Sequence, residues 1–176
     1  DHLDQPYAMN HSPGPRDDAR VSALAGKPAL VRAKEFHQLG LHEEARREWL
    51  TGLAGAGADD WAQAAQLARD WGWYDRMIHA ANRAGLHDAL ELRFPLAFRE
   101  AMARQARESD IDLGLAYALM RKESAFIPDA RSPVGAMGLM QVMPGTGRAV
   151  AGRLGMRNFD VERLYEPDVN LALGGA

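Results

Sequence analysis

Glu123 is the side chain of this sequence best placed to act as a general acid. It comes near the end of a strongly apolar segment, expected to form a helix over about residues 111–124, and the residues three, four and seven positions before it are Met120, Leu119 and Ala116. A carboxylate held against apolar side chains is destabilised as an anion, and the negative end of the helix dipole acts in the same direction. Both effects would keep the proton on this glutamate, as glycosidic cleavage by a general acid requires. An ordinary helix-end glutamate paired with a neighbouring basic residue is the simpler alternative.

Three short motifs begin at this glutamate and follow one another within about twenty residues. They are Glu123–Phe126 (ESAF), Ser132–Ala136 (SPVGA) and Gly138–Pro144 (GLMQVMP). In this order and spacing they closely resemble the soluble lytic transglycosylases, whose catalytic domain is similar to goose-type lysozyme. Arg93–Ala97 resembles that family's junction between a superhelical and a catalytic domain, and Leu164–Gly174 resembles a later helix entry. The resemblance is close over 93–176 and weaker over 17–92.

The resemblance implies roles for four residues. Glu123 matches the family's single catalytic acid and base. Gln141 and Met143 match residues that line the glycan groove beside the scissile bond, and Ser132 matches a polar groove residue. For Met143 the alternative is core packing, and for Gln141 it is a place on a helix surface. No metal and no cofactor is expected, and the implied partner is the glycan strand of peptidoglycan.

The implied reaction is a non-hydrolytic cleavage of the β-1,4 bond between MurNAc and GlcNAc. Glu123 would protonate the glycosidic oxygen and then accept the proton of the MurNAc 6-hydroxyl, which leaves a 1,6-anhydroMurNAc end. A lysozyme-like hydrolase is the alternative within the enzymes, and it would need a second carboxylate. The acids nearest to the motifs are Asp129, Asp160, Glu162, Glu166 and Asp168. A helical-repeat interaction module that carries an inactive lysozyme-like remnant is the alternative outside the enzymes.

The elements that must position these residues are predicted to be helical throughout. Residues 1–16 are an irregular lead-in, and 17–92 have the pattern of helical hairpins with a glycine at each turn, typical of an α-solenoid. Gly40-Leu41-His42-Glu43 is echoed by Gly85-Leu86-His87-Asp88, and Trp71–Asp75 has a related form. The tryptophans of this segment are expected in the core rather than stacked on sugars.

The segment 93–176 is predicted to be the N-terminal part of a lysozyme-like α-helical domain that is truncated at its C-terminus. Pro95 is expected in the first turn of a helix that continues through Ala106. Ser109-Asp110 is expected to cap the helix that carries Glu123. Pro144-Gly145-Thr146 begins another helix, and the loops leave room for one short hairpin. The predicted class is therefore all-α.

Composition excludes several functions. The 176 residues carry a net charge of −3, so no basic surface is expected for nucleic acid. The chain has no cysteine, and its six histidines do not have the spacing of a metal site. No apolar run is long enough for a transmembrane helix, and no signal peptide is recognised. A periplasmic or cell-envelope location is inferred from the substrate alone.

Overall fold

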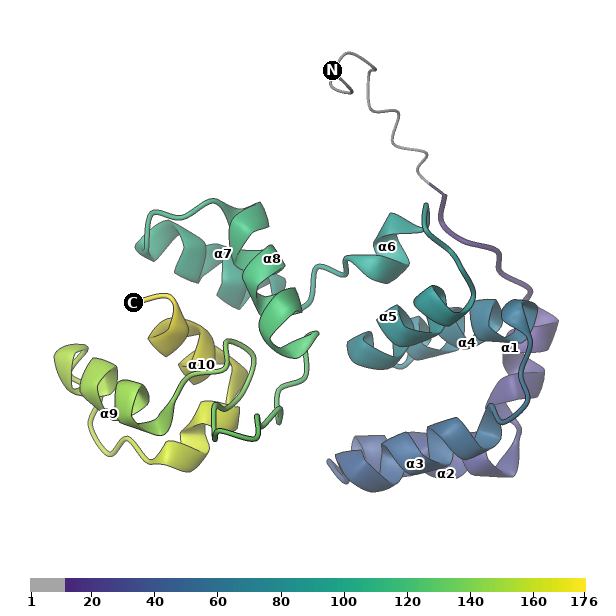
Figure 1. Ribbon diagram of the computed structural model, residues 1–176, viewed down its shortest axis with the longest axis horizontal. Helices are drawn as coiled ribbons and strands as arrows, with labels where there is room; N and C mark the ends of the chain where they lie inside the picture. The colour runs from purple at the N-terminus through teal and green to yellow at the C-terminus, as the bar shows by residue number, and fades with distance from the viewer. Residues whose placement is uncertain (1–11) are drawn as a thin grey trace, which may run out of the picture. The chain divides into compact units, whose positions relative to one another are not determined.

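Helices make up the regular secondary structure in this computed structural model, which describes residues 12–176 (Figure 1). Beside them, the described residues form two isolated β-bridges. The prediction of an all-α fold is confirmed. The chain divides between Pro95 and Leu96 into two units. Of the predicted lead-in at 1–16, residues 1–11 lie outside the described part, and 12–16 contain neither helix nor strand.

Hairpins of helices form the first unit. Its helices are α1 (Asp18–Ala25), α2 (Pro28–Gln38), α3 (His42–Gly52), α4 (Ala58–Asp70), α5 (Tyr74–Arg83) and the short α6 (Leu90–Arg93). Helix α2 packs against α3 and α4 against α5, while α1 connects the two pairs by packing on α4 and α2. The predicted helical hairpins are therefore present.

Glycine ends three of these helices in the same way. After α2 the N–H of Leu41 donates to the carbonyl of Phe36 at 2.9 Å, and Gly40, with φ of 73°, donates to His37. This pair of bonds is the Schellman motif, which needs a left-handed residue at the position that Gly40 fills. The same pair of bonds follows α4 at Gly72 and α5 at Gly85. Each of the repeated glycine turns in the sequence thus ends a helix.

Tryptophans fill the core between the hairpins. Trp49, Trp61 and Trp73 are buried, at 0%, 5% and 3% exposure, and Trp71 is partly buried against the same cluster. Trp49 lies edge-on to Trp73 with ring centroids 5.5 Å apart. The expectation that these rings pack in the core is confirmed.

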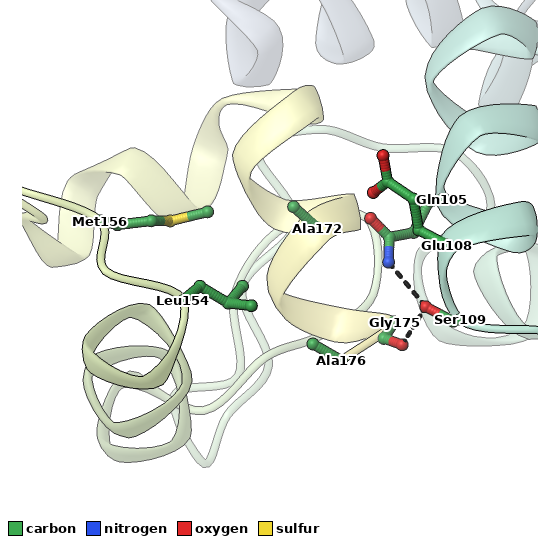
Figure 2. Close-up of a pocket in the computed structure, with 8 residues that line it drawn as sticks. All are labelled: Gln105, Glu108, Ser109, Leu154, Met156, Ala172, Gly175 and Ala176. Carbon is green, nitrogen blue, oxygen red and sulfur yellow. Dashed lines mark hydrogen bonds between the residues drawn. The ribbon is translucent and has the colours of Figure 1, made fainter.

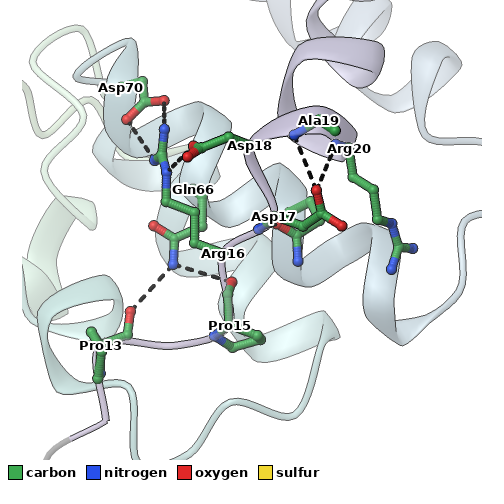
Figure 3. A network of polar contacts seen from close by, with 10 residues as sticks. Pro13, Pro15, Arg16, Asp17, Asp18, Ala19, Arg20, Gln66 and Asp70 are labelled. Carbon is green, nitrogen blue, oxygen red and sulfur yellow. Dashed lines mark hydrogen bonds and ion pairs between the residues drawn. The ribbon is translucent and has the colours of Figure 1, made fainter.

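The segment before α1 is fixed to α4 by polar contacts (Figure 3). The buried Gln66 amide donates to the carbonyls of Pro13 and Pro15 at 3.2 and 3.4 Å. Both guanidinium NH groups of Arg16 donate to Asp70 at 3.0 and 2.9 Å. Asp17 then caps α1, accepting from two backbone N–H groups.

The second unit holds the predicted catalytic motifs. Its helices are α7 (Arg99–Glu108), α8 (Leu113–Ser124), α9 (Pro144–Arg153), the 3-10 helix η1 (Val161–Tyr165) and α10 (Pro167–Gly174). Helix α10 contacts α7, α9 and η1, and α7 packs against α8. The helix predicted from Pro144 is confirmed, and none of the helices among the described residues could span a membrane.

Two local predictions in this unit are wrong. Pro95 does not lie in a first helical turn: α7 begins at Arg99, after Phe98, which has a left-handed φ of 52°. Ser109-Asp110 does not cap the helix of Glu123, because the carboxylate that accepts the N–H of Leu115, at 2.9 Å, is that of Asp112. Asp110 instead takes the left-handed position after α7, with φ of 52°. In both places a residue other than glycine adopts the conformation that local rules reserve for glycine.

Candidate active site

Glu123 lies in the last turn of α8 and is exposed. Of its predicted apolar neighbours, Ala116 and Met120 are buried, at 1% and 0% exposure, but Leu119 is 41% exposed. The expectation that Glu123 is directed at the core is therefore wrong. Glu123 continues an exposed strip that Leu115 and Leu119 form at four-residue spacing along α8. This flank of the helix is less covered than the flank that carries Ala116 and Met120.

The end of α8 is fixed by the residue that follows the glutamate. The buried Ser124 hydroxyl donates to the carbonyl of Met120 at 3.2 Å and accepts the N–H of Phe126 at the same distance. Ala125 and Phe126 both have positive φ, 50° and 67°, and the Phe126 ring is buried. The backbone that carries Glu123 is thus held from inside the unit. Sequence reasoning missed this role of Ser124, although a serine at a helix end is a known signal for such bonds.

Two tight turns connect Glu123 to the second group of predicted site residues. Ile127 donates to the carbonyl of Ser124, and Ala130 donates to that of Ile127. The chain then forms what is called here the bridged loop, residues 131–142, in which Met137 pairs antiparallel with both Arg131 and Val142. This loop is the short hairpin that the sequence left room for.

The remaining predicted site residues all flank the bridges of this loop. Ser132 follows Arg131, and its hydroxyl accepts the N–H of Ala136 at 2.9 Å, so it closes a turn. Gln141 and Met143 stand on either side of Val142. Met143 is 43% exposed, which argues against core packing.

Gln141 is held by its own amide rather than lying on a helix surface. Its Nε2 donates to the carbonyls of Ala130 and Gly138 at 3.2 and 2.9 Å, and its backbone has a left-handed φ of 48°. Because both amide hydrogens have acceptors within the protein, the oxygen Oε1 is the atom with which Gln141 can meet a ligand. Such an atom can accept a hydrogen bond from a sugar hydroxyl or acetamido N–H.

The acids that could supply a second carboxylate are mostly engaged in local structure. Asp160 accepts the N–H of Glu162 and so caps η1. Arg163 donates to both carboxylate oxygens of Glu166, and Arg104 donates to Asp168 at 3.3 Å. These contacts give three of the five candidate acids a structural partner.

A pocket of about 450 Å³ lies elsewhere in the second unit (Figure 2). Its polar side is a short chain of hydrogen bonds, in which Gln105 donates to Ser109 at 2.7 Å and Ser109 donates to the carbonyl of Gly175. None of the four predicted site residues lines it. Within residues 12–176 no group of three or more acidic, histidine or cysteine side chains is arranged to hold a metal ion.

Two family models match this chain and together take in most of it. The soluble lytic murein transglycosylase L domain matches residues 23–90, and the transglycosylase SLT domain matches residues 100–176. All four predicted site residues fall within the second match.

Similar proteins carry the same family name. The soluble lytic murein transglycosylases of Salmonella typhimurium and Escherichia coli K12 are 36% and 34% identical over 154 residues, which are 87% of this chain and 24% of each relative. A structure of the lytic transglycosylase Slt from Pseudomonas aeruginosa, an inactive Glu-to-Gln mutant, matches with a TM-score of 0.88 and 35% identity over 99% of this chain and 28% of that one.

A 70 kDa soluble lytic transglycosylase in complex with bulgecin A also gives a TM-score of 0.88, at 32% identity over 98% of this chain and 28% of that one. The chain spans about a quarter of the length of the relatives it matches. With a helical-hairpin unit that matches the L domain and a Glu-Ser helix end within the SLT match, the chain belongs to the soluble lytic murein transglycosylase family.

Proposed function

We propose that this chain carries the acid/base side of a peptidoglycan lytic transglycosylase, with Glu123 as the single catalytic carboxyl group. The observation that carries the proposal is the end of α8, where an exposed glutamate stands on a backbone locked by Ser124 and Phe126. A side chain that must exchange protons with a substrate has to be accessible and held in place. The Glu123 side chain is accessible, and the backbone that follows it is held by the Ser124 hydroxyl.

In the proposed reaction Glu123 acts twice. It gives its proton to the oxygen that links C1 of MurNAc to GlcNAc, and this C1–O bond breaks. The 2-acetamido group of MurNAc stabilises the cation that develops at C1. The carboxylate then takes the proton of the MurNAc 6-hydroxyl as that oxygen bonds to C1, so a 1,6-anhydro ring forms, no water is consumed and Glu123 ends protonated.

The exposed strip on α8 supports a role for the substrate in holding the proton on Glu123. Leu115 and Leu119 are 53% and 41% exposed beside it. A bound glycan strand that covers this flank would remove water from the carboxyl group and favour its protonated form. Desolvation would then come with binding, in place of the burial that the sequence led us to expect.

Gln141, Met143 and Ser132 are proposed to line the glycan groove. The support for Gln141 is the fixed direction of its amide, and for Met143 it is the exposure of a long apolar side chain next to it. Ser132 contributes through the turn that its hydroxyl closes. Action on peptidoglycan implies that the protein works at the cell envelope, in the periplasm.

The proposal is tested by replacing Glu123 with glutamine in the complete protein that the gene encodes and in the 176-residue chain alongside it. Purified peptidoglycan is digested and the products are identified by mass spectrometry. We expect 1,6-anhydroMurNAc ends from the wild type and a loss of at least about 100-fold in their rate of release by the variant, because general acid–base catalysis of this kind contributes about that factor or more.

Two further variants distinguish a specific role of the Glu123 carboxyl group from a general effect of removing one negative charge. Glu100→Gln changes another exposed glutamate of the same unit and is expected to leave the rate unchanged. Reducing ends in place of anhydro ends, together with a loss of activity in Asp129→Asn, would favour a lysozyme-like hydrolase. If the complete wild-type protein releases neither product, the enzyme proposal is wrong and the interaction module takes its place.

A further inference from the structure

Asn170 is a completely buried polar residue in α10, with 0% of its surface exposed. Its Oδ1 accepts the N–H of Met140 at 2.7 Å. Its Nδ2 donates to the carbonyls of Met137 and Leu164 at 2.9 and 2.7 Å. Both amide hydrogens and the amide oxygen are therefore used, and they join α10 to the end of η1 and to the turn at 138–141.

The turn 138–141 does not provide a hydrogen-bond acceptor for every one of its own backbone N–H groups. Met137 and Val142 exchange both hydrogen bonds at 3.0 Å, and Gln141 donates to Gly138 at 3.2 Å. The N–H of Met140 is left inside the turn without a backbone acceptor, and Asn170 supplies one. A buried donor that loses its acceptor costs about 1–3 kcal/mol, so the folded turn depends on a residue 30 positions away.

Gly138 provides the space that the amide of Asn170 occupies. A Cβ atom at this position would overlap with the Leu164 carbonyl and with the Asn170 amide itself. Gly138 also has a positive φ of 74° and donates to the carbonyl of Ala130 at 2.8 Å. The glycine and the asparagine thus form one complementary pair, although the sequence separates them widely.

The turn is the segment that carries Gln141. The left-handed φ of Gln141 costs a non-glycine residue about 1 kcal/mol or more, so this conformation persists only where surrounding contacts impose it. Its amide reaches the carbonyls of Ala130 and Gly138 only while the turn stays closed. We propose that Asn170 is a positioning residue for the active site, which fixes the turn 138–141 and thereby the direction of the Gln141 amide.

Asn170 acts through Gln141 and touches no glycan, because it is fully buried. This inference rests on the proposed function, in which Gln141 faces the sugar beside the scissile bond. It extends that function to a residue behind the groove, in another helix.

The test is a double-mutant cycle in the complete protein with Asn170→Leu, Gln141→Ala and the combination. Leucine has the same branched arrangement of four side-chain heavy atoms as asparagine but cannot hydrogen bond. We expect Asn170→Leu to lower kcat on purified glycan strands at least tenfold per folded molecule, and to lower it no further when Gln141 is already alanine. Residues that act as one unit show such non-additivity. Losses that multiply would show that Asn170 acts independently of Gln141 and would overturn the proposal.

Gln105→Leu is the matched control, because Gln105 is another buried amide of the same unit, hydrogen bonded to Ser109. It should lower stability while kcat per folded molecule stays within about twofold. An equal loss of kcat in both variants would reduce Asn170 to a general stabilising residue.

Hydrogen exchange gives a readout that does not depend on activity, and its first part needs only the wild type. The Met140 amide of the wild type should exchange at least 100-fold more slowly than in an open loop, and Asn170→Leu should abolish this protection while Gln105→Leu retains it. Fast exchange of Met140 in the wild type would contradict the positioning role. A wild type without anhydro products would sink the proposed function instead, and the exchange rates would still decide whether Asn170 fixes the turn.

Discussion

The close approach behind Gly138 is the tightest constraint on a single residue in the second unit. At this position the backbone conformation and the surrounding space both exclude a side chain, because φ is 74° and a Cβ atom would overlap with Leu164 and Asn170. Gly135 in the same bridged loop also has a positive φ, of 91°, but nothing lies within 4 Å of the place that its Cβ would take. A comparison of the two glycines therefore distinguishes the effect of backbone strain from the effect of steric overlap.

Replacing Gly138 with alanine should therefore destabilise the second unit by about 2–5 kcal/mol, the sum of left-handed strain and overpacking. Gly135→Ala should cost only the strain, about 1–2 kcal/mol. Chemical denaturation followed by far-UV circular dichroism measures both. Equal losses in the two variants would mean that the approach of Asn170 is looser than the structure shows.

At the scale of elements, the start of α8 offers a direct comparison of two aspartates. Asp112 caps the helix, whereas Asp110 lies in the left-handed position after α7. Asp112→Ala should destabilise the unit by about 1 kcal/mol, the usual effect of losing a cap. Asp110→Gly should be neutral or stabilising by up to about 1 kcal/mol, because glycine adopts this conformation without strain. Thermal unfolding of the two variants checks the assignment, and the reverse order of stabilities would contradict it.

The helical hairpins were predictable because their stop signals are local. Gly40, Gly72 and Gly85 each end a helix at the position where glycine is favoured. Asp110 takes such a position after α7 without being glycine, and Phe98 has a left-handed φ directly before α7, so the sequence did not predict where α7 and α8 begin. A rule about residue type cannot find a left-handed residue that tertiary contacts impose.

The candidate site also has features that the local sequence predicts and features that only tertiary contacts determine. The motifs located Glu123, Ser132, Gln141 and Met143 on one continuous stretch of chain. Helical periodicity indicated which face of α8 Glu123 shares, but it could not show that Leu119 on this face is exposed. The bond from Asn170 to Met140 spans 30 residues, and no local pattern points to it.

At the scale of the whole molecule, two kinds of side chain are confined to the first unit. All four tryptophans, at positions 49, 61, 71 and 73, precede Pro95, and so do all six histidines. Tryptophan fluorescence therefore reports the unfolding of the first unit alone. The second unit needs circular dichroism or exchange, as in the experiments above.

His79 gives the first unit a predicted dependence on pH. Burial lowers the pKa of His79 below its ordinary value of 6.5, and the positive charges of Arg76 and Arg83 act in the same direction. Well above pH 6.5 the histidine is neutral in the folded and unfolded states and has no effect on stability. As the pH falls below that value the unfolded chain binds the proton more readily, so the free energy of unfolding decreases until the folded pKa is passed.

We expect tryptophan-detected unfolding to show this loss as the pH falls below about 7, and His79→Gln to reduce it. His87→Gln, at an exposed histidine of the same unit, should leave the slope as in the wild type. A slope that is the same in all three proteins would assign the effect to other groups.

The clamp between Asn170 and the turn has a consequence for the order of events during synthesis. The ribosome synthesises Glu123 and the whole of the bridged loop before Asn170, since the asparagine is added 30 residues after Met140. Until α10 has emerged and docked, the turn lacks the acceptor for its inner N–H and has no reason to hold Gln141 in its strained conformation. A nascent chain therefore contains Glu123 before it can fix the turn that carries Gln141. The docking of α10 therefore sets the earliest point during synthesis at which the turn 138–141 can take its folded form.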